Sequence, residues 1–164
     1  MRLHTASIVL LFLAAPIAHA LDTEINRRSF QDVKTFQILV EPLPPKVEQA
    51  GLTASTIQTD VETKLRQAGI KIADPKAETL VLLYVSVQFW EDSPVALWPY
   101  TISVEVLQDV LVARDTSILV TYSPTWSTHM IGGVQPARVR DLRGAIKDQV
   151  DKFINAYRAV DPRK

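Results

Sequence analysis

The chain has 164 residues, of which 47% are apolar and 22% charged, so it can bury a core and is neither disordered nor collagen-like. It contains no cysteine, which excludes disulfide bonds, thiolate catalysis and thiolate metal sites. Eighteen basic residues balance eighteen acidic ones, so no net positive charge attracts nucleic acid or an anionic membrane surface.

The first 20 residues have the pattern of a secretory signal peptide. Arg2 supplies a positive start, residues 7–17 form an apolar run, and Ala18-His19-Ala20 places small residues before a cleavage site. The run is shorter than the roughly 20 residues that span a membrane. We expect cleavage after Ala20 and a bacterial periplasmic or secreted location, because no lipidation cysteine and no glycosylation sequon follows. The alternative is an uncleaved N-terminal anchor.

The first part of the mature chain predicts a lead-in, a strand and a helix. Residues 21–34 are polar and are expected to be an extended lead-in to a single domain, residues 35–164. Residues 36–40 predict a strand, which ends at a proline-rich connector because proline cannot donate to a ladder. Residues 53–68 predict a helix with one apolar residue every four positions, followed by Gly69 as a stop. Its N-terminal cap is either a Ser55–Gln58 capping box or Thr53.

Three strands and a closing helix are expected next. Residues 80–90, 100–112 and 117–126 alternate between apolar and polar side chains, and their short connections predict an antiparallel meander. In this pattern Ile118, Val120 and Tyr122 share the core face with Trp126. Residues 127–135 are expected to be a loop around Gly132-Gly133. Residues 136–160 predict a helix with a core-facing stripe. The stripe consists of Val139, Leu142, Ile146, Val150, Phe153, Tyr157 and Val160.

These elements predict an α+β fold with the order β-α-β-β-β-α. The economical architecture is a two-layer sandwich, in which a four-stranded, mainly antiparallel sheet carries both helices on one face. The pattern leaves the place of the first strand in the sheet open.

The second face of the predicted sheet is half polar and half apolar. Its apolar half is expected to form one patch, which marks a contact surface unless the lead-in or a helix covers it. Asp109 interrupts the patch unless a β-bulge turns it outward. The patch consists of Leu80, Leu82, Tyr84, Leu107, Leu111 and Leu119.

Apolar residues also occupy the hairpin tip between Trp90 and Tyr100, where polar residues are usual. Leu97 and Trp98, with Trp90, would form a docking site for a partner protein, because Trp side chains anchor interfaces. Alternatively, this loop folds back over the edge of the sheet.

Few residues in the mature chain suit catalysis or metal binding. His129 is its only histidine, and no phosphate-binding glycine loop is present, so we predict no catalytic residue, no metal and no cofactor. Ser127 beside His129 leaves a hydrolase as an alternative. The basic residues Arg138, Arg140, Arg143 and Lys147 form either a solvated face or a site for a phosphate or acidic partner.

The closing segment, Val150 to Tyr157 followed by Asp161-Pro162, resembles the last helix of small exported bacterial families of unknown function. The layout of the mature chain is also similar to small α+β modules of envelope proteins, such as the N-terminal domain of TolB and the activators of peptidoglycan synthases. The resemblance concerns topology over most of the mature chain and implies an envelope module. No functional motif matches, so it assigns no site residue.

Taken together, these patterns predict a non-catalytic periplasmic or secreted module that binds another envelope protein or associates with itself. The alternatives are a small-ligand-binding protein with a cleft at the Trp90/Trp98 loop, and a hydrolase around His129. No nucleic-acid partner and no membrane span after cleavage are expected.

Overall fold

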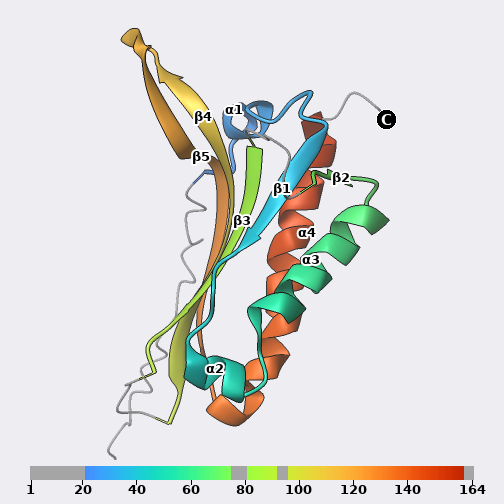
Figure 1. Cartoon of the computed structure of the whole chain (residues 1–164), viewed down its shortest axis with the longest axis vertical. Helices are drawn as coiled ribbons and strands as arrows, with labels where there is room; N and C mark the ends of the chain where they lie inside the picture. The colour runs from blue at the N-terminus through green and yellow to red at the C-terminus, as the bar shows by residue number, and fades with distance from the viewer. Residues whose placement is uncertain (1–20, 75–80, 92–95, 161–164) are drawn as a thin grey trace, which may run out of the picture.

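The computed structural model describes residues 21–74, 81–91 and 96–160, and these form two layers (Figure 1). The strands are β1 (Thr35–Val40), β2 (Lys71–Ile72), β3 (Val81–Phe89), β4 (Trp98–Val112) and β5 (Asp115–Val134). The helices are α1 (Glu24–Arg28), α2 (Pro45–Gln49), α3 (Ala54–Gln67), the 3₁₀ helix η1 (Pro136–Asp141) and α4 (Leu142–Val160). The long helices α3 and α4 lie on the same face of the sheet, as predicted, and we call the opposite face the reverse face.

The sheet is mixed and has five strands, where the sequence predicted four mainly antiparallel ones. Its order is β2-β1-β3-β4-β5. β1 is parallel to both of its neighbours, whereas β3, β4 and β5 form the predicted antiparallel meander. β2 escaped prediction because two residues are too few to show an alternation. β1 and β3 are parallel because α3 carries the chain across the sheet between them.

Helix α3 forms where its apolar spacing predicts it. Thr53 is the N-terminal cap, since its hydroxyl accepts the backbone N–H of Thr56 at 3.2 Å. Ile57, Val61 and Leu65 are buried against the sheet. Gly69 has a φ of +77°, the left-handed conformation that stops a helix and that glycine adopts without strain.

The closing helix begins later than predicted. Residues 136–141 form η1, and α4 starts only at Leu142. The predicted stripe faces the core, where Val150 and Phe153 are fully buried and Val160 is partly buried. Among the described helices, none is long and apolar enough to cross a membrane.

The predicted lead-in is not simply extended, because residues 24–28 form α1. The backbone C=O of Leu21 accepts the N–H of Ser127 at 3.3 Å, and the Asn26 side chain donates to the C=O of Thr125 at 3.0 Å. The Ser127 N–H and the Thr125 C=O both lie on the outer edge of β5, which is the last strand of the sheet. The N-terminal segment therefore covers part of an edge strand that would otherwise be open to pairing.

An aromatic cluster joins this segment, the sheet and α4. Phe153 of α4 is its centre, and its ring centroid lies 5.1 Å from that of Phe36 and 5.7 Å from that of Trp126. Phe30 and Tyr157 complete the cluster, at centroid distances of 6.0 Å and 6.2 Å from Phe153. Phe36 and Trp126 meet Phe153 edge to face, and such ring contacts stabilise the fold beyond the burial of the rings themselves.

The segment predicted as a loop, residues 127–135, is the second half of β5. Gly132 lies opposite Tyr100 of β4, and a side chain at Gly132 would overlap the Tyr100 ring, 2.7 Å from Cζ. Gly132 therefore makes room for a buried tyrosine within a strand, although a Gly-Gly pair usually indicates a turn.

Three of the four basic residues predicted as a group near the start of α4 are paired with carboxylates of the chain. Arg143 binds both carboxylate oxygens of Asp60 on α3, at 2.8 and 2.9 Å, and Lys147 lies 3.3 Å from the same carboxylate. Arg138 pairs with Asp141 at 2.8 Å. The bonds of Arg143 and Lys147 to Asp60 clamp α3 to α4 and lower the pKa of Asp60, with the Arg143 hydrogen bond as the largest cause.

We expect Asp60→Asn to reduce the acid sensitivity of the protein. A folded-state pKa below the unfolded value stabilises the fold above the unfolded pKa, and this contribution disappears as the pH falls through the folded pKa. The variant should be less stable than wild type at neutral pH, and the difference should shrink below about pH 4. Urea unfolding over a pH series measures this, with Asp148→Asn as the control at an exposed carboxylate. A constant difference at all pH values would contradict the assignment.

Phe153→Ala should destabilise the protein by about 3–5 kcal/mol, because it opens a cavity at the centre of the aromatic cluster. Chemical unfolding monitored by circular dichroism measures the change. Asn155→Ala, at an exposed position of α4, is the control. A loss below about 1 kcal/mol would show that the cluster can close around the missing ring.

Candidate functional site

The hairpin of β4 and β5 extends beyond the rest of the sheet. β3 pairs with β4 only as far as Val81 opposite Gln108. Beyond this point, within the described residues, β4 and β5 pair only with each other, through Val110 opposite Val120 and Leu111 opposite Leu119. Figure 1 shows this two-stranded end projecting past α1 and the start of β1. We call residues 109–123 the arm.

The arm is apolar and exposed on both of its faces. Five large apolar residues in it are each between 40% and 63% exposed. They are Leu111, Ile118, Leu119, Val120 and Tyr122. Two-stranded hairpins are only marginally stable in water, so an apolar one without a covering layer indicates a contact element.

Two β-bulges shape the base of the arm. The first falls between Val106 and Leu107, where β5 contributes the extra residue Thr125 next to Pro124. Proline is tolerated there because β5 is an edge strand. At the second bulge Tyr122 has a φ of +51°, and its backbone N–H donates to the Asp109 carboxylate at 3.1 Å. A bulge is therefore present at Asp109, as the predicted patch required, and the half-buried Asp109 carboxylate serves there as the acceptor of the Tyr122 N–H.

The prediction for the arm itself was wrong on one point. Ile118, Val120 and Tyr122 were expected on the core face, but the core ends before the arm begins and they are exposed. A signal was present in the sequence, because residues 110–112 and 118–120 are consecutive apolar runs, without the alternation of a half-buried strand.

The structure divides the predicted apolar patch into two pairs. Leu82 lies opposite Leu107 on the reverse face, and Leu111 lies opposite Leu119 in the arm. Leu82 is buried, whereas Leu107 and Tyr84 are half-buried. Leu80 lies outside the described residues. The two leucines of the arm are thus the most exposed members of the predicted surface.

The polar half of the reverse face contains a hydrogen-bonded chain around His129. Ser103 contacts Nδ1 of the imidazole, Ser127 Oγ lies 3.1 Å from Nε2, and Ser103 Oγ lies 3.4 Å from a Glu105 oxygen. If Nδ1 carries the proton, each group has a partner, from Ser127 through His129 and Ser103 to Glu105. Ser127 is only 2% exposed and its hydroxyl contacts His129 of the same strand, so it is poorly placed for attack on a substrate. The contact between Ser103 and His129 is the one that joins β4 to β5.

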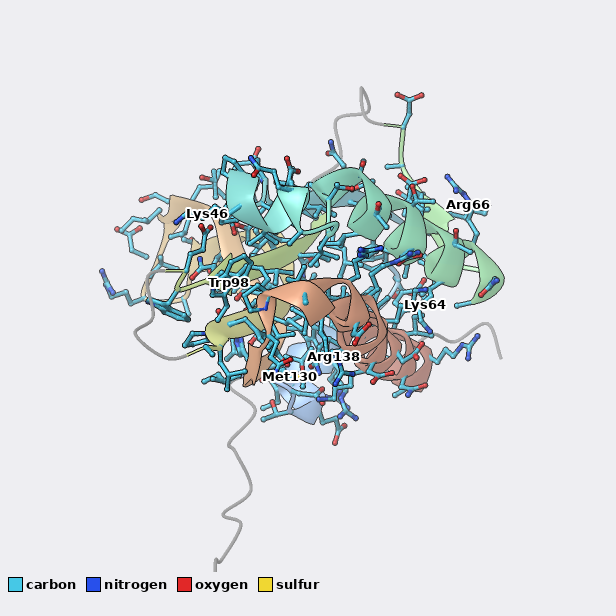
Figure 2. All side chains as sticks on the ribbon, turned by 90° about the horizontal axis from the view of Figure 1, so that it is seen from below. Lys46, Lys64, Arg66, Trp98, Met130 and Arg138 are labelled. Atoms are coloured by element: carbon cyan, nitrogen blue, oxygen red, sulfur yellow. The ribbon has the colours of Figure 1, made fainter. Side chains whose placement is uncertain are left out.

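The three residues of the predicted tip site are not brought together. Trp98 packs against Phe89, with ring centroids 6.3 Å apart, and is partly buried against the core. Leu97 lines a cavity beside Arg138 and Asp141, while Trp90 lines a different cavity beside Glu41. This end of the molecule faces the viewer in Figure 2, where Trp98 and Arg138 are labelled.

The possible metal ligands in the described part of the chain are His, Asp and Glu side chains. No three His, Asp or Glu side chains there are grouped so that they could hold an ion. The sequence contains no cysteine that could add a ligand.

The sequence matches no known family and no curated protein. Among solved structures, the chain is similar to the PelC dodecamer from Paraburkholderia phytofirmans, with 14% identity, a TM-score of 0.42, and coverage of 76% of this chain and 86% of that one. A point variant of the same PelC gives 12% identity, a TM-score of 0.42, and coverage of 76% and 85%. A minor lipoprotein from Acinetobacter baumannii gives 11% identity, a TM-score of 0.38, and coverage of 74% and 90%. These similarities are distant and concern the course of the chain alone.

Tyr84 of β3 lies opposite Glu105 of β4, and its hydroxyl is hydrogen-bonded to Glu41, the residue that follows β1. Burial raises the pKa of Tyr84 to about 12, and the hydrogen bond to Glu41 and the charges of Glu41 and Glu105 add to the effect. We expect Glu41→Gln to lower the pKa of Tyr84 while leaving it above the usual value of about 10, because burial remains. Ultraviolet absorbance of tyrosinate measures the titration.

The same shift makes the fold sensitive to alkali. A tyrosine pKa raised on folding stabilises the protein below about pH 10, and this contribution is lost as the pH rises through 12. Tyr122→Phe removes the exposed tyrosine of the arm from the absorbance signal and serves as the control. Titration of Tyr84 near its usual pKa would show that Glu41 and burial do not act on it.

Proposed function

We propose that this protein is a non-catalytic, exported binding module that associates through its arm, and that the first partner is a second copy of the chain. The observation that carries this proposal is the exposure of large apolar side chains on both faces of a two-stranded hairpin. Burial of one such side chain contributes about 1.5–3 kcal/mol, so a partner that covers several of them gains a large apolar contribution.

Charge supports a second copy as the partner. Arg114 and Asp115 lie side by side at the tip, and the third charged residue of the arm, Asp109, is engaged with the backbone of Tyr122. An arm with nearly balanced charge meets an identical arm without like-charge repulsion. The N-terminal segment contacts β5 at Thr125 and Ser127, which lie at the base of the arm and not within it. The outer edge of β5 within the arm therefore offers backbone groups for strand pairing between copies.

The proposal predicts that single charges in the arm prevent association. We expect the chain without residues 1–20 to form oligomers that grow with concentration in sedimentation velocity, and we expect Leu111→Glu and Leu119→Glu each to yield monomers. Circular dichroism should be unchanged, because both side chains lie outside the core.

Ile25→Glu is the matched control. Ile25 is 80% exposed on α1, outside the arm, so its substitution should leave the oligomer intact. A wild-type chain that is monomeric at every concentration would reject self-association. Loss of the oligomer in the Ile25 variant would show that the arm is not the surface responsible.

A further inference from the structure

A small cavity lies where β1 leaves the sheet, at the end of the molecule opposite the arm. The backbone N–H of Glu41 makes the last bond to β3, to the C=O of Val85 at 2.9 Å. Pro42 and Pro44 have no N–H, so the chain cannot continue the ladder and turns into α2. β3 runs on to Phe89, and a cavity of about 320 Å³ remains beside its last residues.

The lining of this cavity combines an aromatic face with polar groups. Trp90 is 55% exposed, and Gln88 beside it is also exposed. Both project on the reverse face, because they alternate with the core-facing Val87. The cavity is lined by Glu41, Pro42, Pro44, Val87, Gln88, Phe89 and Trp90.

The carboxylate of Glu41 is only partly satisfied. The Tyr84 hydroxyl is hydrogen-bonded to it, but its Oε2 is buried and accepts no hydrogen bond from the described residues. A buried acceptor without a donor is costly, so such atoms call for an explanation. Because Glu41 also lines the cavity, a ligand there with a hydroxyl group would supply a donor to this carboxylate.

We propose that this cavity binds one ring of a neutral saccharide. The C–H face of a pyranose packs against the indole of Trp90, a hydroxyl donates to Glu41, and the Gln88 amide donates to a second hydroxyl. The volume lies near the lower limit for small-ligand sites, which suits a single ring. The negative charge of Glu41 disfavours acidic sugars.

An added peptide strand fits this place less well. The open part of β3 spans only residues 87–89, which offers too short a ladder for a bound strand. Trp98 does not line this cavity, so the ligand cleft predicted at the Trp90/Trp98 loop is replaced in this proposal by one between Trp90 and Glu41.

The test uses the N-acetylglucosamine trimer as a neutral probe and the galacturonic acid trimer as an acidic probe. Isothermal titration calorimetry gives the affinity, and the shift of the Trp90 indole N–H resonance in NMR spectra locates the site. We expect the neutral trimer to bind more tightly than the acidic one. Trp90→Ala and Glu41→Gln should each weaken binding of the neutral trimer at least tenfold.

Leu97→Ala is the matched control, because Leu97 is exposed nearby but lines another cavity. It should leave binding of the trimer unchanged. The proposal is overturned if neither trimer shifts the Trp90 resonance, if Trp90→Ala binds as well as wild type, or if a proline-rich peptide binds at Trp90 and the saccharide does not. Sedimentation of Trp90→Ala should match wild type, so this site can fail while the arm proposal stands.

Discussion

Trp126 determines where the folded core ends and where the arm begins. Its ring packs against Phe30 and Phe153, and its indole N–H donates to the Asp22 carboxylate at 2.7 Å. Trp126 pairs with Val106 of β4, and the first bulge lies directly beside this pair on the side of the arm. From this point toward the tip, neither α3 nor α4 covers the hairpin (Figure 1). One buried indole thus joins the N-terminal segment, the edge strand and the closing helix at the base of the arm.

This base holds the arm in a defined place. Gln108 donates to the backbone C=O of Ser29 at 3.1 Å and to the Thr125 hydroxyl at 2.7 Å, directly where the first bulge bends β5. Arg27 holds Asp22, and Asp22 holds Trp126, so the N-terminal segment is fixed to the same point. Because its base is fixed by these hydrogen bonds, the arm would lose little conformational freedom on binding, and this favours association.

The elements whose residues follow a local periodicity were predicted correctly from the sequence. The predictions failed at positions whose structure depends on contacts with residues distant in the sequence. Helix α3, the stripe of α4 and the core face of β3 follow from spacing alone, because each buries one face against a continuous layer. The alternation of residues 117–126 pointed to the same layer, but the helices are too short to cover β5 there. Gly132 suggested a loop because its real reason, the ring of Tyr100 across the ladder, comes from a distant part of the chain.

The candidate site was predicted in part for the same reason. Leu111 and Leu119 were placed on the contact surface, and they are opposite each other in the arm. The cavity beside Trp90 could not be located, since it arises from a difference in length between β1 and β3 that only the pairing reveals.

The two proposed binding regions lie at opposite ends of a rigid sheet and depend on different features of the chain. The arm is present because β4 and β5 extend beyond their pairing with β3. The cavity is present because β1 ends at Pro42, before β3 ends. The strands between them are held by buried side chains such as Val85, Val104 and Val106. A substitution at either end therefore leaves the other end's support intact, so the arm and the cavity can be tested independently of each other.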